Sequence, residues 1–338
     1  MRFTRLSIAD IPQISRLLMS VWPGNYGRMG FPNFREDYLH WVFGGPNSDK
    51  HILLGGKIND EFVAYLSSLY RRISYRGRTI NGYLYTHITI SPHLSSRVRF
   101  DGLLKMLHLI QDIYFSSDCD LIYGFSEERK GFRDNLMKLG ETYTKIDFKN
   151  ARQLAFNQFL VDPGKLRKYL QEDSGEIGKL QLRPASDSDY AEITALFNRK
   201  GAEKGLSVQM AEEELRHHFH GHPDHRTFVT ESNGIIKGFN NYYALDIIKG
   251  DKSCKYVVVE LLVSEDTNGN YITALLQETI NFAEEIGARA VVIENATYLN
   301  YDACKTLGLL ATFRRMIMTV IPRTCLIDDL DGFMCDVK

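Results

Sequence analysis

The chain of 338 residues is too long for one ordinary compact core, so its length predicts two domains. A formal net charge of −1 argues against a general affinity for nucleic acid or for an anionic membrane surface. The five cysteines are scattered without C-x-x-C spacing, the first residues lack the apolar core of a signal peptide, and no apolar run is long enough to span a membrane, so we expect a soluble, cytoplasmic protein with reduced thiols.

The first predicted elements are a strand that ends near Arg5 and an amphipathic helix that follows it. Ser7 and Asp10 have the spacing of a capping box, in which the serine oxygen accepts a hydrogen bond from the third helical N–H and the aspartate favours the helix start. Asn59-Asp60 marks the turn of a hairpin. The later elements of this half are strands at 83–91 and 120–125 around a helix from residue 102, a short helix that ends at Leu139-Gly140, where glycine suits the C-cap, and a closing strand at 155–161.

The second half repeats this order. Arg183 ends a strand, Ser186 and Asp189 form a second capping-box pattern, and Asn233-Gly234 is a strong hairpin signal. Strands at 256–264 and 290–295, a helix from residue 272 and a short helix that ends at 307–308 complete the list. The repeat predicts a tandem duplication with an N-terminal domain at 1–162, a linker at 163–179 and a C-terminal domain at 180–338; one large α/β domain with coincidental periodicity is the alternative.

The second half also carries a resemblance to a known family. Residues 260–295, ELLVSEDTNGNYITALLQETINFAEEIGARAVVIEN, resemble the central strand, cofactor loop and following helix of the GNAT superfamily of N-acetyltransferases, including the helix-ending Gly287. The IAD of residues 8–10 and the RPASDSD from Arg183 resemble the opening of that fold. The resemblance implies an α/β (α+β) protein of two tandem acyl-CoA N-acyltransferase folds, each a mixed, mostly antiparallel twisted sheet flanked by helices. It also implies an N-acetyltransferase type of acyltransferase with acetyl-CoA, or another acyl-CoA, as co-substrate.

In that family, a splayed strand pairs with the pantetheine arm, and a loop of the form Arg/Gln-x-x-Gly-x-Gly/Ala then points N–H groups at the pyrophosphate. Both copies depart from the glycine pattern, since Val98 and Phe100 lie near those positions in the first copy, and Asn270 and Ile272 in the second. The resemblance is therefore one of element order more than of motif.

Charge distinguishes the two predicted cofactor loops. Arg97 and Arg99 line the first, whereas Glu265 and Asp266 begin the second and would repel the phosphates of coenzyme A. We therefore predict the coenzyme A site in the first copy; an ordinary solvated arginine face is the alternative. The resemblance places the following residues of that copy at the cofactor: Ile88, Thr89, Ile90, Ser95, Ser96, Arg97, Val98, Arg99, Phe100 and Gly102.

Two candidate general bases occupy equivalent places in the two copies. His87 and Glu260 each lie in the strand before the cofactor loop, where the acyl thioester meets the amine in the family, so either could deprotonate the acceptor. The structural alternatives are a hydrogen-bonded core histidine and a structural carboxylate. The tyrosine that often protonates the leaving thiolate in the family is missing, because Leu136 and Cys304 lie near its positions.

The expected partner is a small-molecule or peptide amine acceptor, without nucleic acid or membrane, and the oligomeric state stays open. The aromatic segment 22–41 would form part of the acceptor pocket or pack on the sheet. The histidine-rich run 217–225 lacks a completing carboxylate or cysteine, so we expect no metal. Two rival functions are an aminoacyl or long-acyl transferase with its cleft around Glu260, and a non-catalytic binding or regulatory protein whose cofactor loops have decayed.

Overall fold

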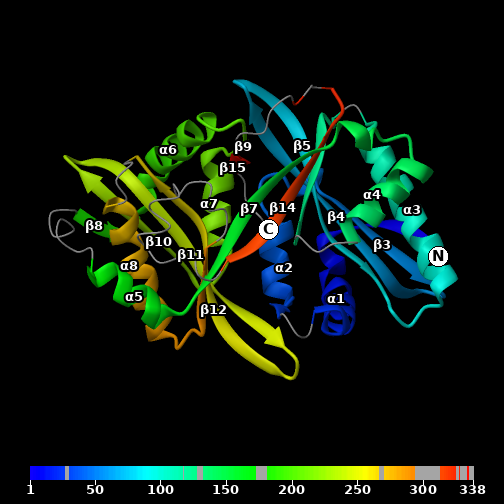
Figure 1. Cartoon of the computed structure of the whole chain (residues 1–338), viewed down its shortest axis with the longest axis horizontal. Helices are drawn as coiled ribbons and strands as arrows, with labels where there is room; N and C mark the ends of the chain where they lie inside the picture. The colour runs from blue at the N-terminus through cyan, green and yellow to red at the C-terminus, as the bar shows by residue number, and fades with distance from the viewer. Residues whose placement is uncertain are drawn as a thin grey trace. The chain divides into compact units, whose positions relative to one another are not determined.

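The computed structural model describes the chain except for residues 27–29, 117, 128–131, 173–180, 266–269, 294–312, 325–326, 328–332 and 335–338. The backbone divides into two compact units (Figure 1). The N-terminal unit consists mainly of Met1–Ala155 with Met316–Asp331, and the C-terminal unit consists of Phe156–Arg315 with Gly332–Val337. Each unit is described by itself below.

The N-terminal unit is a mixed sheet with helices packed on it. Its elements are β1 (Arg2–Leu6), the 3-10 turn η1 (Ile8–Asp10), α1 (Ile11–Tyr26), β2 (Phe31–Pro32), α2 (Glu36–Phe43), β3 (Ile52–Ile58), β4 (Glu61–Tyr75), β5 (Arg78–Ile90), α3 (Ser96–Tyr114), β6 (Leu121–Glu127), α4 (Phe132–Tyr143) and β14 (Phe313–Pro322). The strand order is β1-β3-β4-β5-β6-β14, and neighbours are antiparallel except for the parallel pair β5 and β6.

The C-terminal unit repeats this arrangement. Its elements are β7 (Arg152–Val161), α5 (Pro163–Glu172), β8 (Gln181–Pro184), the 3-10 turn η5 (Asp187–Asp189), α6 (Tyr190–Ala202), β9 (Leu206–Gln209), α7 (Glu212–His220), β10 (His225–Ser232), β11 (Ile235–Lys249), β12 (Lys252–Ser264), α8 (Asn270–Glu285), β13 (Ala290–Ile293) and β15 (Phe333–Met334). The sheet order is β8-β10-β11-β12-β13-β7, again with one parallel pair, β12 and β13.

Both units bury side chains on the two faces of their sheets, because successive residues of a strand point to opposite sides. In β4, Leu66 packs in the cluster under α3, whereas the ring of its neighbour Tyr65 contacts Phe43 of α2. In β11, Tyr242 packs against Phe282 of α8. The helix that follows the central strand therefore covers one face of each sheet. On the other face, α2 packs in the N-terminal unit, and α7 packs in the C-terminal unit through Phe219 against Phe239.

The duplication predicted from the sequence is confirmed in the order of elements. Both capping boxes form, at Ser7 with Asp10 and at Ser186 with Asp189. The two hairpin turns are also present, since Asn59 and Asp60, like Asn233 with its glycine, adopt the positive φ that these short turns require. The expected class, two mixed sheets flanked by helices, is correct.

One strand of each unit comes from the other half of the sequence. The strand at 155–161, expected to close the first copy, begins the C-terminal unit as the end of β7, where Phe159–Val161 pairs with β13. Conversely, Met316–Pro322 of β14 pairs with β6 in the N-terminal unit. The first part of the expected linker forms α5, which packs on α8 through the ion pair of Arg167 with Glu284. The predicted domain boundary at 163–179 stays a prediction. Each compact unit of the structure includes one strand from the other half of the sequence.

Gly140 does not end its helix, contrary to the sequence prediction. Helix α4 continues to Tyr143, and the ring of Phe148 occupies the space that a Cβ of residue 140 would need. Glycine is therefore required for close packing rather than for a C-cap. The matching helix end in the second half, at 307–308, lies outside the described residues. No helix in the described part of the chain is long and apolar enough to cross a membrane.

Candidate functional site

A β-bulge in each copy lies at the residue predicted to be the base. In the first copy, Tyr65 pairs with Thr89 and Ser67 with Thr86, so that two residues of β5, His87 and Ile88, face one residue of β4. A bulge of this kind redirects a side chain and bends its strand. His87 also has a positive φ of 55°.

The second copy has its bulge at the equivalent place in β12. Asn241 pairs with Leu261 and Tyr242 with Val259, which leaves Glu260 as the extra residue. Leu261 lies opposite Asn241 on the face away from α8, since Tyr242 is on the α8 face. Glu260 contacts α7, so the bulge turns it toward this same face.

The parallel partner strand stops pairing just before each bulge. The ladder between β5 and β6 runs from Gly82–Leu121 to Tyr85–Gly124, although β5 continues to Ile90. The ladder between β12 and β13 ends at Val259, although β12 continues to Ser264. Each copy thus has a central strand whose last residues extend beyond its parallel pairing, next to the start of a helix.

His87 lies among aromatic side chains on the α1 and α2 face. Its ring centroid is 5.5 Å from that of Phe34, 5.8 Å from Phe43 and 6.3 Å from Trp22. Its Nδ1 lies 3.1 Å from the hydroxyl of Ser67. Burial lowers the pKa of His87 to about 4, so the imidazole is neutral at pH 7 and a weak base. This environment is that of a residue that holds the bulge in shape.

Glu260 has polar surroundings instead. Its Oε1 lies 3.1 Å from Nε2 of His218 in α7, and the two side chains are only 3% and 8% exposed. On the same face of the sheet, the amide nitrogen of Asn241 donates to the hydroxyl of Thr227 at 3.0 Å. The two bulges therefore share a backbone shape and differ in chemistry.

Of the residues predicted to bind coenzyme A, Ile88, Thr89 and Ile90 are the last residues of β5, and those from Ser95 onward form the start of a helix rather than a loop. Ser95 is the N-cap of α3 and accepts a hydrogen bond from the N–H of Val98 at 3.4 Å. Residues 96–100 form the first turns of α3, where Arg97 and Arg99 are exposed. The first N–H groups of a helix and its dipole favour an anion at this end. Gly102 is buried and packs against Met1, which explains its small size.

Solved structures show the fold to which this geometry belongs. No protein-family model matches the sequence, and no curated protein sequence matches it significantly. A Saccharomyces cerevisiae N-myristoyltransferase with bound myristoyl-CoA is similar with a TM-score of 0.67 at 13% identity, over 95% of this chain and 78% of that one. A second structure of the yeast enzyme has a TM-score of 0.66 at 14% identity, over 95% and 82% of the two chains. An Enterococcus faecalis protein described as "Probable N-Acyltransferase" has a TM-score of 0.56 at 10% identity, over 96% and 73%.

The chain has the GNAT fold, twice. The resemblance inferred from the sequence is therefore confirmed at the level of fold. Within the GNAT fold, the two bulges and the two helix starts lie at corresponding places in the two copies.

The acidic start of the second GNAT loop is neutralised by cations. Glu265 forms ion pairs with Arg199 and, at 3.1 Å, with Lys237. These hydrogen bonds and charges lower the pKa of Glu265, which keeps it ionised. The contrast in charge between the two loops is thus smaller than the sequence indicates. Asp266 and Gly269 lie outside the described residues.

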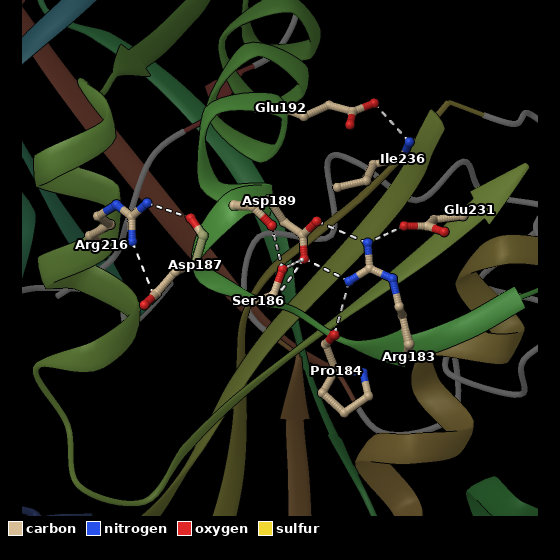
Figure 2. Close-up of polar contacts among 10 residues, drawn as sticks. Arg183, Pro184, Ser186, Asp187, Asp189, Glu192, Arg216, Glu231 and Ile236 are labelled. Atoms are coloured by element: carbon tan, nitrogen blue, oxygen red, sulfur yellow. Dashed lines mark hydrogen bonds and ion pairs between the residues drawn. The ribbon is translucent and has the colours of Figure 1, made fainter. Parts of the chain in front are cut away.

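An ion-pair network fixes the start of the second GNAT copy (Figure 2). Arg183 of β8 donates two hydrogen bonds to Asp189, at 2.6 and 2.9 Å, and also pairs with Glu231 of β10. Arg216 of α7 reaches Asp187 at 3.2 Å. Arg183 thus joins the turn before α6 to β8 and β10, and Arg216 joins the middle of α7 to the same turn. These pairs help to hold α7 in the position from which it contacts Glu260.

His218 is the residue of this site that the sequence analysis missed. It belongs to the histidine-rich run, which was considered for metal binding, and no cluster of metal-binding side chains occurs among the described residues. A usable signal existed: His218 follows Leu215 and precedes Phe219 on the buried face of α7. A histidine on such an apolar face needs a polar partner, and Glu260 in its apolar strand needs one too.

Proposed function

We propose that the protein is an acyl-CoA-dependent N-acyltransferase that transfers an acyl group to a primary amine by direct attack. The observation that carries this proposal is the central strand β5, which bulges and leaves its parallel pairing directly before the N-terminus of α3. The fold similarity to N-acyltransferases supports the same reading.

The first copy offers the better cofactor site. Main-chain groups of Ile88, Thr89 and Ile90, which lie beyond the parallel ladder, would pair with the pantetheine arm. The first turn of α3 with Arg97 and Arg99 would hold the pyrophosphate. A strand N–H would then stabilise the tetrahedral oxyanion, while water or the neutral His87 would take the amine proton.

The acyl group is proposed to be longer than acetyl. The sequence predicts acetyl-CoA by family resemblance, but the yeast structures contain myristoyl-CoA, and the similarity to them extends over 95% of this chain. A long acyl chain is therefore the first to test, with acetyl-CoA beside it.

Calorimetric titration with acetyl-CoA and myristoyl-CoA tests the cofactor site. We expect the double variant Arg97→Glu and Arg99→Glu to weaken binding by at least about tenfold, because two phosphate-facing charges are reversed. Arg16→Glu on α1 makes the same substitution at one exposed position away from the site and is the control. The Glu265→Gln variant should bind acyl-CoA as tightly as the wild type, because Glu265 lies in the second copy. Absence of binding at millimolar ligand would overturn the proposal and favour a non-catalytic protein.

A second candidate places the reaction in the C-terminal copy, as an aminoacyl or long-acyl transferase. The contact of Glu260 with His218 favours it, because it gives a carboxylate a polar partner at the second bulge, whereas burial lowers the pKa of His87 and makes it a weak base. Glu260→Gln and His87→Gln decide between the copies. Loss of turnover only in the first variant assigns the chemistry to the C-terminal copy, and loss only in the second assigns it to the N-terminal copy.

A further inference from the structure

Helix α7 brings one imidazole directly to the bulge of β12. Nε2 of His218 and Oε1 of Glu260 are 3.1 Å apart, a distance at which a protonated imidazole forms an ion pair with a carboxylate. Both residues are buried, at 7% and 4% exposure. A buried carboxylate stays ionised only where a cation or hydrogen-bond donors compensate its charge.

Three nearby polar side chains among the described residues have partners of their own. The amide nitrogen of Asn241 donates to the hydroxyl of Thr227. Arg216 of α7 pairs with Glu212 of the same helix. It also pairs with Asp187 (Figure 2). Nδ1 of His222 accepts from the N–H of Asp224 at 3.2 Å, and its ring packs on Tyr243. In the described part of this unit, His218 contacts Glu260 through Nε2.

We propose that His218 is a positioning residue for Glu260: its imidazole holds the carboxylate at the bulge, in place to take the proton of an incoming amine. The inference rests on the proposed acyltransferase function in its second-copy form. The amine loses a proton to Glu260, its nitrogen forms the bond to the acyl carbon, and the carbon–sulfur bond breaks. The leaving thiolate then receives the proton from the Glu260 carboxyl group, which restores the carboxylate.

Two substitutions separate positioning from simple packing. His218→Gln keeps an N–H donor near the place of Nε2, whereas His218→Leu keeps the bulk without a donor. We expect His218→Leu to lower kcat by about 10- to 100-fold with an unchanged KM for acyl-CoA, and His218→Gln to recover most of the loss. His220→Leu, on the exposed side of the same helix, is the control and should have wild-type turnover. Equal kcat values for the Leu and Gln variants would contradict the proposal.

The contact between His218 and Glu260 can also be tested by NMR, without any measurement of turnover. The variant for this test is Glu260→Gln, which keeps the size of the side chain and removes its charge. In the full-length protein, the ¹⁵N signals of the His218 ring report which nitrogen carries the proton. Glu260→Gln should change these signals and leave those of His220 in place; unchanged His218 signals would refute the coupling.

The two hypotheses fail in different ways. If the wild type neither binds nor uses acyl-CoA, the proposed function fails, and the ring signals alone decide whether His218 and Glu260 are coupled. If the wild type transfers an acyl group while Glu260→Gln and His218→Leu do so equally well, the function stands and the positioning role is refuted.

Discussion

The two copies of the fold have a β-bulge at the same place, but the residue at the bulge differs. At the first bulge, His87 adopts a positive φ and packs among aromatic rings, and its pKa falls to about 4. At the second, Glu260 contacts His218 in a polar environment. The bulge and the end of the parallel ladder are common to both. The comparison shows that the duplicated feature is a shape of the main chain, on which each copy carries its own chemistry.

The helix starts differ less than the bulges do. Arg97 and Arg99 are exposed at the start of α3, whereas Glu265 before α8 is paired with Arg199 and Lys237. An acidic residue counts as a repulsive charge only while it lacks such partners. Local sequence charge is therefore a weaker guide to the cofactor site than the arrangement of charges in the fold.

The largest expected effect on stability comes from His87→Glu, which places a carboxylate at the first bulge, as Glu260 does at the second. His87→Glu would bury a carboxylate against Phe34, Phe43 and Trp22, with the Ser67 hydroxyl as its polar neighbour. We expect a loss of at least about 3 kcal/mol in the free energy of unfolding, measured by urea denaturation. The neutral His87→Gln should lose far less. If His87→Glu and His87→Gln lost the same free energy of unfolding, the burial of a charge among these rings would have no cost of its own.

A somewhat smaller effect is expected from pH. The imidazole of His87 binds its proton near pH 6.5 in the unfolded chain and near pH 4 in the folded protein. Between these values the unfolded chain holds more protons, so stability falls as the pH is lowered from 6.5, by about 3 kcal/mol at pH 4. Urea denaturation over this range measures it. His87→Gln should have the flatter profile, and parallel profiles would contradict the assignment.

The smallest effect compares the two capping boxes. Asp189 is buried and binds Arg183 with two hydrogen bonds, which lower its pKa, whereas Asp10 binds only Ser7 among its described partners. We expect Asp189→Asn to cost about 2 kcal/mol and Asp10→Asn about 0.5 kcal/mol in urea denaturation. If Asp10→Asn cost as much, the arginine would add nothing to the second box.

The sequence predicts those features that depend on neighbouring residues. Capping boxes, the turns at Asn59-Asp60 and Asn233-Gly234, and the equivalence of His87 and Glu260 all follow from local spacing, and the structure confirms their places. The roles proposed for His87 and Glu260, and the cofactor set around Arg97, stay predictions. The sequence does not predict that α3 begins at Ser96, because a serine such as Ser95 is equally common in a loop and at an N-cap.

Features that depend on distant residues were missed. The apolar strand 155–161 carries no local signal that selects β13 as its partner, since any sheet edge with apolar faces would accept it. Gly140 fits a C-cap until the ring of Phe148 is known to lie against it. Likewise, His218 gains its meaning only when α7 brings it to Glu260.

The exchange of strands sets the order in which the molecule can be completed during synthesis. Strand β6 ends at Glu127, but the strand that covers its edge, β14, ends at Pro322. At roughly 5 to 20 residues per second, the ribosome needs on the order of 10 to 40 s to make the intervening chain. Throughout that interval β6 has an uncovered edge, a known template for aggregation. The nascent N-terminal unit therefore depends on a strand that is made much later in the chain, and a ribosome that stalls before β14 would leave this sheet with an open edge.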